Sequence, residues 1–264
     1  MKLVNVPGIN GLGKTFGCDN AFDEVVKHLK NLELNERGVS LEDVNVLEIG
    51  VDYDSIEVNN ELIYERAFSL FGEKVMFVGG DHSISYPLTR AFFDKCESIG
   101  REPCLIVMDA HPDCMEPMKE PTHEEWLRKL IEDGFPAQNI LLIGVRNISP
   151  EELSFLREKK IKSISLNSFL VNIEDSCDSL MEFARGKELY VSIDIDVVDP
   201  SFAPGTGYRE VGGFTSREVI YLIQRISKMK NLRAVDLVEI NPEKDFEDLT
   251  VKLGAKIVSE VISD

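Results

Sequence analysis

Positive charge is scarce in this sequence of 264 residues, which carries 29 Lys and Arg against 47 Asp and Glu for a formal net charge of −18. Such an excess of negative charge repels phosphate backbones and anionic lipids, so we expect no nucleic-acid partner and no membrane partner. The same field attracts metal ions and cationic small molecules. Most of these carboxylates are nevertheless typical of a solubilising surface, so charge carries only minor weight.

Long apolar runs and paired cysteines are missing as well. No stretch approaches the roughly 18 apolar residues that span a bilayer, and Met1–Thr15 lacks the apolar run of a signal peptide. The five cysteines form no CxxC pair and are odd in number, which predicts free thiols, a reducing compartment and hence a cytoplasmic location. Because no Pro-, Gly- or Ser-rich linker divides the chain, we expect one domain over residues 1–264.

Short apolar runs alternate along the chain with amphipathic stretches. The runs predicted to be buried strands are Leu3–Val6, Val75–Val78, Leu105–Met108, Ile140–Ile143, Leu189–Ile195 and Ala234–Val238. The stretches predicted to be helices are Asn20–Leu32, Tyr86–Glu97, Glu124–Glu132, Ser176–Ala184, Ser216–Lys228 and Asp248–Ile262. This alternation predicts an α/β fold, a three-layer αβα sandwich with a mainly parallel central sheet. Ligands of such sheets bind beyond the carboxyl ends of the strands.

Histidine and aspartate residues cluster directly after three of the predicted strands, in GGDHS at 79–83, DAHPD at 109–113 and SIDIDVVDP at 192–200. Asp194 and Asp196 interrupt an apolar pattern and would face one side of a buried sheet, where two unpaired like charges are costly. Divalent cations remove that cost, and oxygen and nitrogen ligands without thiolate suit ions such as Mn²⁺. A residue of this kind can also be a turn or cap residue, but three such segments together favour a metal centre.

The three segments resemble the signature motifs of the ureohydrolases, the family of arginases, agmatinases and formiminoglutamases. The match continues in FAPGTG at 202–207, GGFT at 212–215 and DLVEINP at 236–242, and covers the chain from about residue 73 onward. The resemblance implies an arginase-like fold, trimers or hexamers of identical chains, and two divalent ions, with Mn²⁺ expected. It places His82 and Asp113 at one ion, His111 and Asp196 at the other, and Asp109 and Asp194 between them.

By the same resemblance, the protein hydrolyses a small cationic guanidino substrate to urea and an amine, and the ions activate the attacking water. Glu239 would hold the guanidinium group by charge-assisted hydrogen bonds, and Asp109 would join it as a catalytic residue. His123 lies near the proton-shuttling histidine of the family, which makes it a candidate for catalysis and for substrate binding. The match weakens there because Glu124 replaces the usual glycine, and a histidine before a helix can be an ordinary cap-region residue.

Departures from the arginase pattern bear on the substrate. Met115 stands where arginases carry an asparagine for the amino-acid end of arginine, and Ser149 where they place an aspartate. These differences favour agmatine, which would yield putrescine and urea. Other guanidino acids, guanidine and formiminoglutamate remain alternatives. The acidic side chains that could attract the distal ammonium group of agmatine are Glu116, Glu120, Glu124 and Glu125.

An alternative of another class comes from Gly8–Thr15, which matches the phosphate-loop pattern GxxxxGK[ST] and follows a predicted strand, as in an ATPase. In a phosphate loop the helix begins at the lysine and threonine, whereas Gly17, Asp19 and Asn20 predict a helix that starts near Ala21. That alternative also leaves the aspartate pair of the third segment without a role. A family member that binds ligand without catalysis is another alternative, which the retention of all six ligands disfavours.

Overall fold

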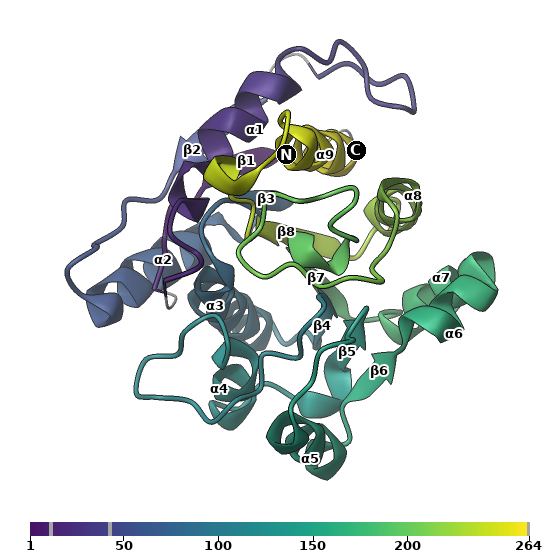
Figure 1. Ribbon diagram of the computed structural model, residues 1–264. Coiled ribbons are helices and arrows are strands. Elements are labelled where there is room, and N and C mark those ends of the chain that lie inside the picture. The colour runs from purple at the N-terminus through teal and green to yellow at the C-terminus, as the bar shows by residue number, and fades with distance from the viewer. Residues whose placement is uncertain (11–12, 42–43, 263–264) are drawn as a thin grey trace.

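The computed structural model describes residues 1–10, 13–41 and 44–262. Within them, eight strands form one parallel sheet in the order β2-β1-β3-β8-β7-β4-β5-β6. The strands are β1 Lys2–Asn5, β2 Asn45–Glu48, β3 Val75–Val78, β4 Pro103–Met108, β5 Ile140–Ile143, β6 Lys162–Ile164, β7 Glu188–Asp194 and β8 Leu232–Val238. Figure 1 shows this sheet running through the molecule between two sets of helices.

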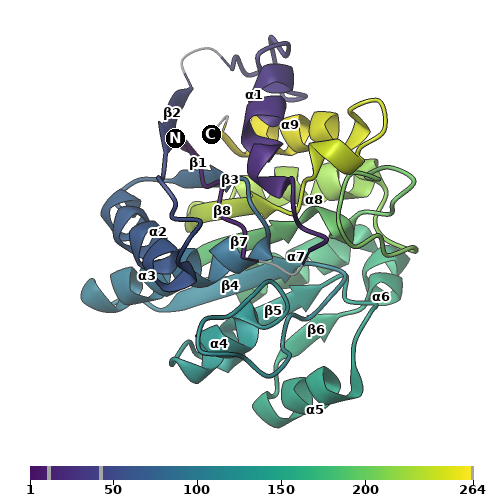
Figure 2. The ribbon, with the colours of Figure 1, turned by 60° about the vertical axis from the view of Figure 1, so that its left-hand side comes forward.

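The helices of the described residues are α1 Ala21–Leu29, α2 Ile56–Leu70, α3 Ser85–Ser98, α4 Trp126–Glu132, α5 Pro150–Lys159, α6 Leu166–Val171, α7 Ile173–Phe183, α8 Ser216–Ser227 and α9 Leu249–Ile262. Alternate side chains of β4 point to opposite faces of the sheet and enter two hydrophobic cores. In the first core, Ile106 and Met108 pack with α1 and α6 to α9. In the second core, Leu105 and Val107 pack with α2 to α5. Figure 2 shows α2 to α5 on their side of the sheet. The predicted three-layer αβα sandwich is therefore confirmed.

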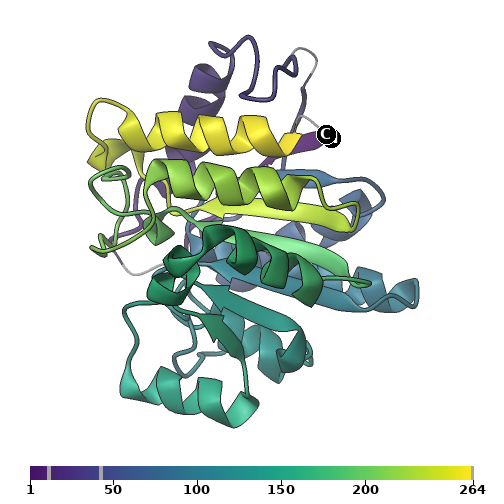
Figure 3. The same ribbon diagram turned by 90° about the vertical axis from the view of Figure 1, so that its right-hand side faces the viewer.

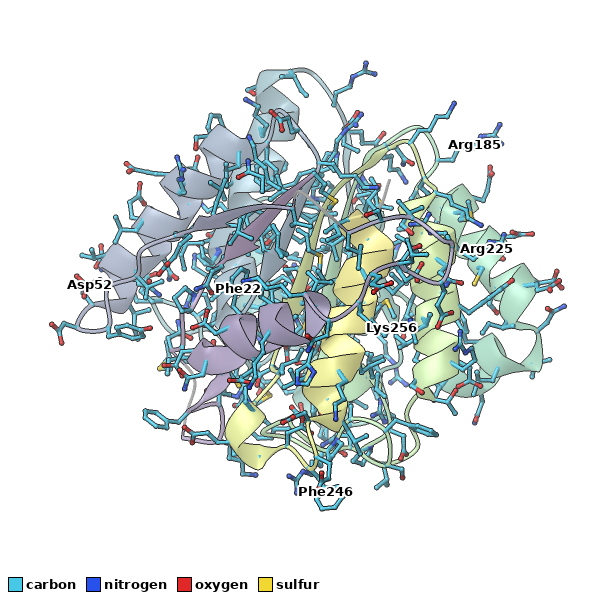
Figure 4. All side chains as sticks on the ribbon, turned by 90° about the horizontal axis from the view of Figure 1, so that it is seen from above. Phe22, Asp52, Arg185, Arg225, Phe246 and Lys256 are labelled. Carbon is cyan, nitrogen blue, oxygen red and sulfur yellow. The ribbon has the colours of Figure 1, made fainter. Side chains whose placement is uncertain are left out.

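The helices of the first core are packed side by side. Figure 3 shows α8 and α9, in light green and yellow, lying along each other, and these two helices are in contact. Seen from above, α1 lies beside α9 in turn, with Phe22 on α1 and Lys256 on α9 (Figure 4). No helix in the described part of the chain is both long and apolar enough to cross a bilayer.

All six predicted strands and all six predicted helices are present, with ends that differ by at most three residues. Five elements were not predicted: β2, β6, α2, α5 and α6. The two missed strands are the edges of the sheet, where exposed polar residues replace the buried apolar run. In α2 the apolar residues fall on more than one face, since Ile56, Val58 and Leu62 are exposed whereas Ile63 and Leu70 are buried.

The turn after β3 depends on glycine. Gly79 and Gly80 have φ angles of +119° and +70°, in the left-handed region that glycine adopts without strain. A Cβ atom on Gly80 would lie 2.1 Å from the carbonyl oxygen of Gly8, so only glycine lets the N-terminal segment pass this close. The turn then delivers His82 to the carboxyl end of the sheet, at the start of a short 3-10 helix.

Candidate metal centre

The segments after β3, β4 and β7 meet at the carboxyl end of the sheet, as predicted. β8, which lies between β3 and β7, adds Glu239 directly after its last residue. The six predicted ligands come together at this edge: His82, Asp109, His111, Asp113, Asp194 and Asp196. All of them are buried except His111, whose side chain is 22% exposed.

His82 is the centre of a first group of ligands. Its Nδ1 lies 3.0 Å from Asp109 Oδ2, 2.9 Å from Asp113 Oδ2 and 3.3 Å from Asp194 Oδ2. None of these approaches has the geometry of a hydrogen bond, and within the described part of the chain both His82 Nδ1 and Asp109 Oδ2 are buried without a hydrogen-bond partner. The ring nitrogen of His82 and the carboxylate oxygens of Asp109 and Asp113 all lie within 4.8 Å of one another, and this donor set matches that of a divalent cation.

The other nitrogen of His82 supports this interpretation. Nε2 lies 2.9 Å from Ser192 Oγ, and the Ser192 hydroxyl donates to Asp236 Oδ1 at 2.7 Å. Because the serine proton is used by Asp236, the serine oxygen accepts the Nε2 proton, and Nδ1 carries a free lone pair toward the carboxylates. Asp236 is held in turn by the hydroxyls of Tyr190 and Ser85, at 2.8 and 3.0 Å. His82 is thus oriented as a metal ligand.

His111 is the centre of a second group. Its Nδ1 lies 3.0 Å from Asp196 Oδ2 and 3.5 Å from Asp109 Oδ1, so Asp109 offers one oxygen to each group, as its predicted bridging role requires. Asp194 approaches the first group through Oδ2, while its Oδ1 accepts the backbone N–H of Asp196 at 2.7 Å. Two ions that share Asp109 are the arrangement that these residues fit.

The raised pKa values of two buried carboxylates also indicate that cations bind beside them. Burial, followed by the carboxylates of Asp196 and Asp109, raises the pKa of Asp194 well above its usual range. Burial and the nearby Asp81 do the same to the pKa of Glu239. Carboxylates in such surroundings keep their negative charge at neutral pH only when positive charge lies beside them, which two divalent ions and a cationic substrate would supply.

Glu239 faces the ligand cluster from the end of β8. Its Oε1 accepts the backbone N–H of His82 at 2.9 Å, and its Oε2 accepts the S–H of Cys18 at 3.8 Å. The backbone of Glu239 has a φ of +63°, and that of Asp113 a φ of +49°, conformations that cost free energy outside glycine and are concentrated at functional sites. Both side chains are therefore held in place by the surrounding fold.

A cavity of about 290 Å³ opens above the ligands. It is lined by His82, His111, Asp113, Met115, His123, Glu124, Asn147, Ile148, Ser149, Glu152, Asp194, Asp196, Tyr208 and Glu239. His123 is 6% exposed, and neither of its ring nitrogens has a hydrogen-bond partner among the residues that the structure describes. Its ring lies 5.3 Å from the ring of Tyr208, and burial lowers its pKa. A neutral imidazole with two free nitrogens thus faces this cavity.

The four acidic side chains proposed for an ammonium group are separated by the structure. Glu124 lines the cavity, whereas Glu125 is buried and accepts the backbone N–H of Thr122 at 2.7 Å. Glu120 accepts a hydrogen bond from the Asn60 side chain at 2.7 Å, and Glu116 is exposed. Only Glu124 is placed to meet a ligand in the cavity.

The phosphate-loop match is not accompanied by phosphate-loop geometry. Residues 11 and 12 of Gly8–Thr15 lie outside the described residues, but the first α-helix after the motif begins at Ala21 rather than at Lys14. Thr15 donates its hydroxyl proton to Asp81 Oδ2 at 3.0 Å, and Lys14 Nζ lies 4.6 Å from the centre of the Tyr208 ring. The threonine and lysine are engaged beside the ligand cluster, which argues against the ATPase alternative.

Several residues of the site were not predicted. Trp126 donates from Nε1 to Asp113 Oδ2 at 2.8 Å, and Cys18 and Tyr208 border Glu239 and His123. Ser192 and Asp236, which orient His82, stand inside quoted motifs and were given no role. Position in those motifs was a usable signal for these two, whereas no pattern in the sequence marks Cys18 or Tyr208.

Comparison with known proteins decides the family, because the sequence model of the arginase family matches residues 5–263. The chain belongs to the arginase family. It is therefore an amidinohydrolase from a family that depends on two metal ions. It is 32% identical to arginase 1, mitochondrial, of Arabidopsis thaliana over 256 residues, which are 93% of this chain and 70% of that protein.

Other arginase-family relatives carry other names. The chain is 30% identical to the agmatinase of Bacillus anthracis over 230 residues, which are 84% of this chain and 76% of that protein. Among solved structures, the proclavaminate amidino hydrolase of Streptomyces clavuligerus matches with a TM-score of 0.87 and 23% identity, over 98% of this chain and 89% of that one. The structural match shows the shared arginase-family fold.

Proposed function

We propose that this protein hydrolyses agmatine to putrescine and urea, with two Mn²⁺ ions held by the His82 and His111 groups. The observation that carries the choice of agmatine is the charge of the cavity. Besides the metal ligands and Glu239, its described lining residues include the carboxylates of Glu124 and Glu152 and no lysine or arginine. A cavity of this kind favours a dication over arginine, whose carboxylate would lie unpaired among like charges.

The chain's own residues would orient the substrate and move a proton. The ions, when bound, supply an activated water near neutral pH. Glu239 would hold the guanidinium group beside them, since its carboxylate is fixed by the backbone of His82 and by the Cys18 thiol. His123, neutral and free at both nitrogens, would take up a proton at a ring nitrogen and deliver it to the departing amine.

Glu124 is the proposed partner of the distal ammonium group. It lines the cavity, and its Oε1 lies 3.7 Å from His123 Nε2, so a ligand beside His123 would reach it. Glu124→Gln should raise KM for agmatine about 5-fold or more while kcat changes less, because the contact would be made equally before and during the reaction. Glu116→Gln is the matched control, since Glu116 is exposed and does not line the cavity.

Lys14 favours a second candidate, the hydrolysis of a guanidino acid. Its ammonium group lies over the Tyr208 ring, which lines the cavity, and would be close to a carboxylate tail. Lys14→Met would then raise KM for guanidinobutyrate and leave KM for agmatine unchanged. If agmatine is the substrate, the same variant should leave KM unchanged or lower it.

The test is urea release by metal-stripped protein reconstituted with Mn²⁺, Ni²⁺, Co²⁺ or Zn²⁺. The substrates are agmatine, L-arginine, guanidinobutyrate, guanidinopropionate and guanidine, with formamide release from formiminoglutamate measured alongside. We expect agmatine to have the highest kcat/KM, and Glu239→Gln to abolish turnover while both ions remain bound. Turnover that is highest with another substrate would replace agmatine, and a protein that binds no metal would overturn the whole proposal.

A further inference from the structure

The turn after β5, Gly144–Asn147, supplies none of the expected metal ligands and yet contacts the segments that carry His111 and Asp196. The backbone N–H groups of Arg146 and Asn147 both donate to the carbonyl oxygen of Ala110, at 2.8 and 3.0 Å. Ala110 is the residue between Asp109 and His111, and its own N–H donates to Asp196 Oδ1 at 3.0 Å. The turn therefore fixes the segment that carries His111 and, through it, the carboxylate of Asp196.

The guanidinium group of Arg146 is used entirely as a clamp on backbone. Nη2 donates to the carbonyl oxygens of Asp196 and Glu210, at 2.6 and 2.7 Å. The remaining N–H groups donate to the carbonyl oxygens of Val211, Gly144 and Val197, at 3.1, 3.2 and 3.3 Å. All five donors of the planar fork are thus satisfied, a pattern that the point charge of a lysine cannot reproduce. Arg146 ties the Asp196 backbone to the later loop at residues 210–211.

The side chain of Asn147 extends this clamp to His111. Asn147 Nδ2 donates to Glu210 Oε1 at 2.9 Å, and the same carboxylate oxygen lies 3.6 Å from His111 Nε2. Asn147 Nδ2 itself lies 3.5 Å from His111 Nε2, so the amide of Asn147 and the carboxylate that it holds both border that ring nitrogen. The Glu210 carboxylate beside His111 is thus positioned by the hydrogen bond from Asn147 Nδ2. The hydrogen bond from Arg146 Nη2 to the Glu210 carbonyl oxygen holds the backbone of the same residue.

The first group has a separate set of supports. His82 is oriented by Ser192 and Asp236, and Asp113 by Trp126 Nε1 at 2.8 Å. Neither Arg146 nor Asn147 is among these partners. The supports of the first group therefore contact His82 and Asp113, whereas Arg146 and Asn147 contact the carbonyl oxygen of Ala110, the residue between the shared Asp109 and His111.

We propose that Arg146 and Asn147 are positioning residues that set the affinity of the ion at His111 and Asp196, with little effect on the ion at His82 and Asp113. This rests on the proposed two-ion centre. Loss of contacts to the partners of metal ligands typically lowers metal affinity by about 10–100-fold, so we expect that loss at one of the two ions only. The chemistry at Glu239 and His123 would be affected only through the missing ion.

The experiment is a titration of metal-stripped protein with Mn²⁺, followed by calorimetry and by metal counting after gel filtration. The wild type should bind two ions. Arg146→Lys and Asn147→Ala should each bind one ion with unchanged affinity and the second about 10-fold or more weakly. Arg157→Lys is the matched control, because Arg157 is exposed on α5 and should leave both ions unaffected.

The outcomes separate this inference from the proposed function. The inference would be overturned if the variants bound both ions with unchanged affinity, or if they lost affinity equally at both ions. A merely structural role of Arg146 and Asn147 would lower Tm without making the two affinities differ. A wild type that binds fewer than two ions would instead overturn the two-ion proposal itself. If Arg146→Lys does not fold, Asn147→Ala decides, since its exposed side chain can be removed without opening a buried space.

Discussion

Cys18 Sγ lies 3.8 Å from Glu239 Oε2, so a thiol from the N-terminal segment touches the carboxylate proposed to hold the guanidinium group. Burial, and then the Glu239 carboxylate, raises the pKa of this thiol well above its usual value. The thiol therefore stays protonated at neutral pH and remains a hydrogen-bond donor. The same segment donates from Thr15 to Asp81 and packs Lys14 on Tyr208. The N-terminal segment, which holds none of the signature motifs, thus contributes to the site.

Removing the Cys18 thiol should weaken the grip of Glu239 on the substrate. Cys18→Ala removes one donor to a buried carboxylate, which is worth on the order of 1 kcal/mol for a weak donor, so KM should rise about 5-fold. Cys18→Ser should restore most of the loss because a hydroxyl also donates. Steady-state kinetics measure the effect, with Cys177→Ala as the control, because Cys177 is a buried cysteine on α7 that does not line the cavity. An unchanged KM in Cys18→Ala would show that the thiol does not act on Glu239.

The thiols should resist alkylation in the folded protein. All five cysteines are buried and free, and burial raises the pKa of Cys96 and Cys104 to about 12 and that of Cys177 to about 11. Because the thiolate is the reactive form, iodoacetamide at a pH of about 8.5 should label no cysteine of the native protein and all five after unfolding. Intact-mass spectrometry counts the labels. Rapid modification of native Cys18 would contradict the buried position described for it.

Ser192 should matter for metal binding although it is not a ligand. It links His82 Nε2 to Asp236, so Ser192→Ala removes the group that holds the imidazole in its binding tautomer. The affinity for the ion at His82 should fall by about 10-fold or more, and the ion at His111 should be unaffected. A calorimetric Mn²⁺ titration measures both affinities. Ser227→Ala is the control, because the Ser227 hydroxyl donates to the Ile223 carbonyl oxygen within α8. If Ser192→Ala and Ser227→Ala changed the Mn²⁺ affinities equally, Ser192 would not act on the metal centre through His82.

How far the sequence predicts this protein depends on where each residue lies. The central strands and the convergence of the six expected ligand residues were predictable, since buried parallel strands have continuous apolar runs and these polar residues interrupt the runs at strand ends. The edge strand β2 was not, because three of its four residues are exposed and its pattern carries no apolar run. α5 was missed although Ser149 and Glu152 form a capping box around Pro150, a signal that could have located its start.

The supporting residues of the site were harder to predict than the ligands. Arg146 bonds to backbone carbonyls from residue 144 to residue 211, and carbonyl groups leave no trace in an amino-acid sequence. Cys18 meets Glu239 across 221 positions of the chain, a contact that only the order of the strands brings about. Long-range contacts of this type follow from the fold, so local patterns cannot reveal them.

Metal removal should destabilise the protein. His82 Nδ1 and Asp109 Oδ2 are buried without hydrogen-bond partners among the described residues, and ions that bind only the folded state would stabilise it. One ion at 100 times its Kd contributes about 2.7 kcal/mol, so two ions should raise Tm by roughly 10–20 °C. Thermal unfolding with EDTA, and again after Mn²⁺ is restored, measures the shift. Asp194→Asn should reduce the shift, and an equal Tm in both conditions would contradict a metal centre.

Replacing Gly80 should displace both the N-terminal segment and the turn after β3. In Gly80→Ala the new Cβ would lie 2.1 Å from the Gly8 carbonyl oxygen, and alanine would also be strained at a φ of +70°. Strain of this kind costs about 1–3 kcal/mol, and the displaced turn would carry His82 with it, so both Tm and Mn²⁺ affinity should fall. Gly72→Ala is the matched control, because a Cβ there meets no atom within 4 Å. If Gly80→Ala lowered Tm but left Mn²⁺ affinity intact, the position of His82 would not depend on this close approach.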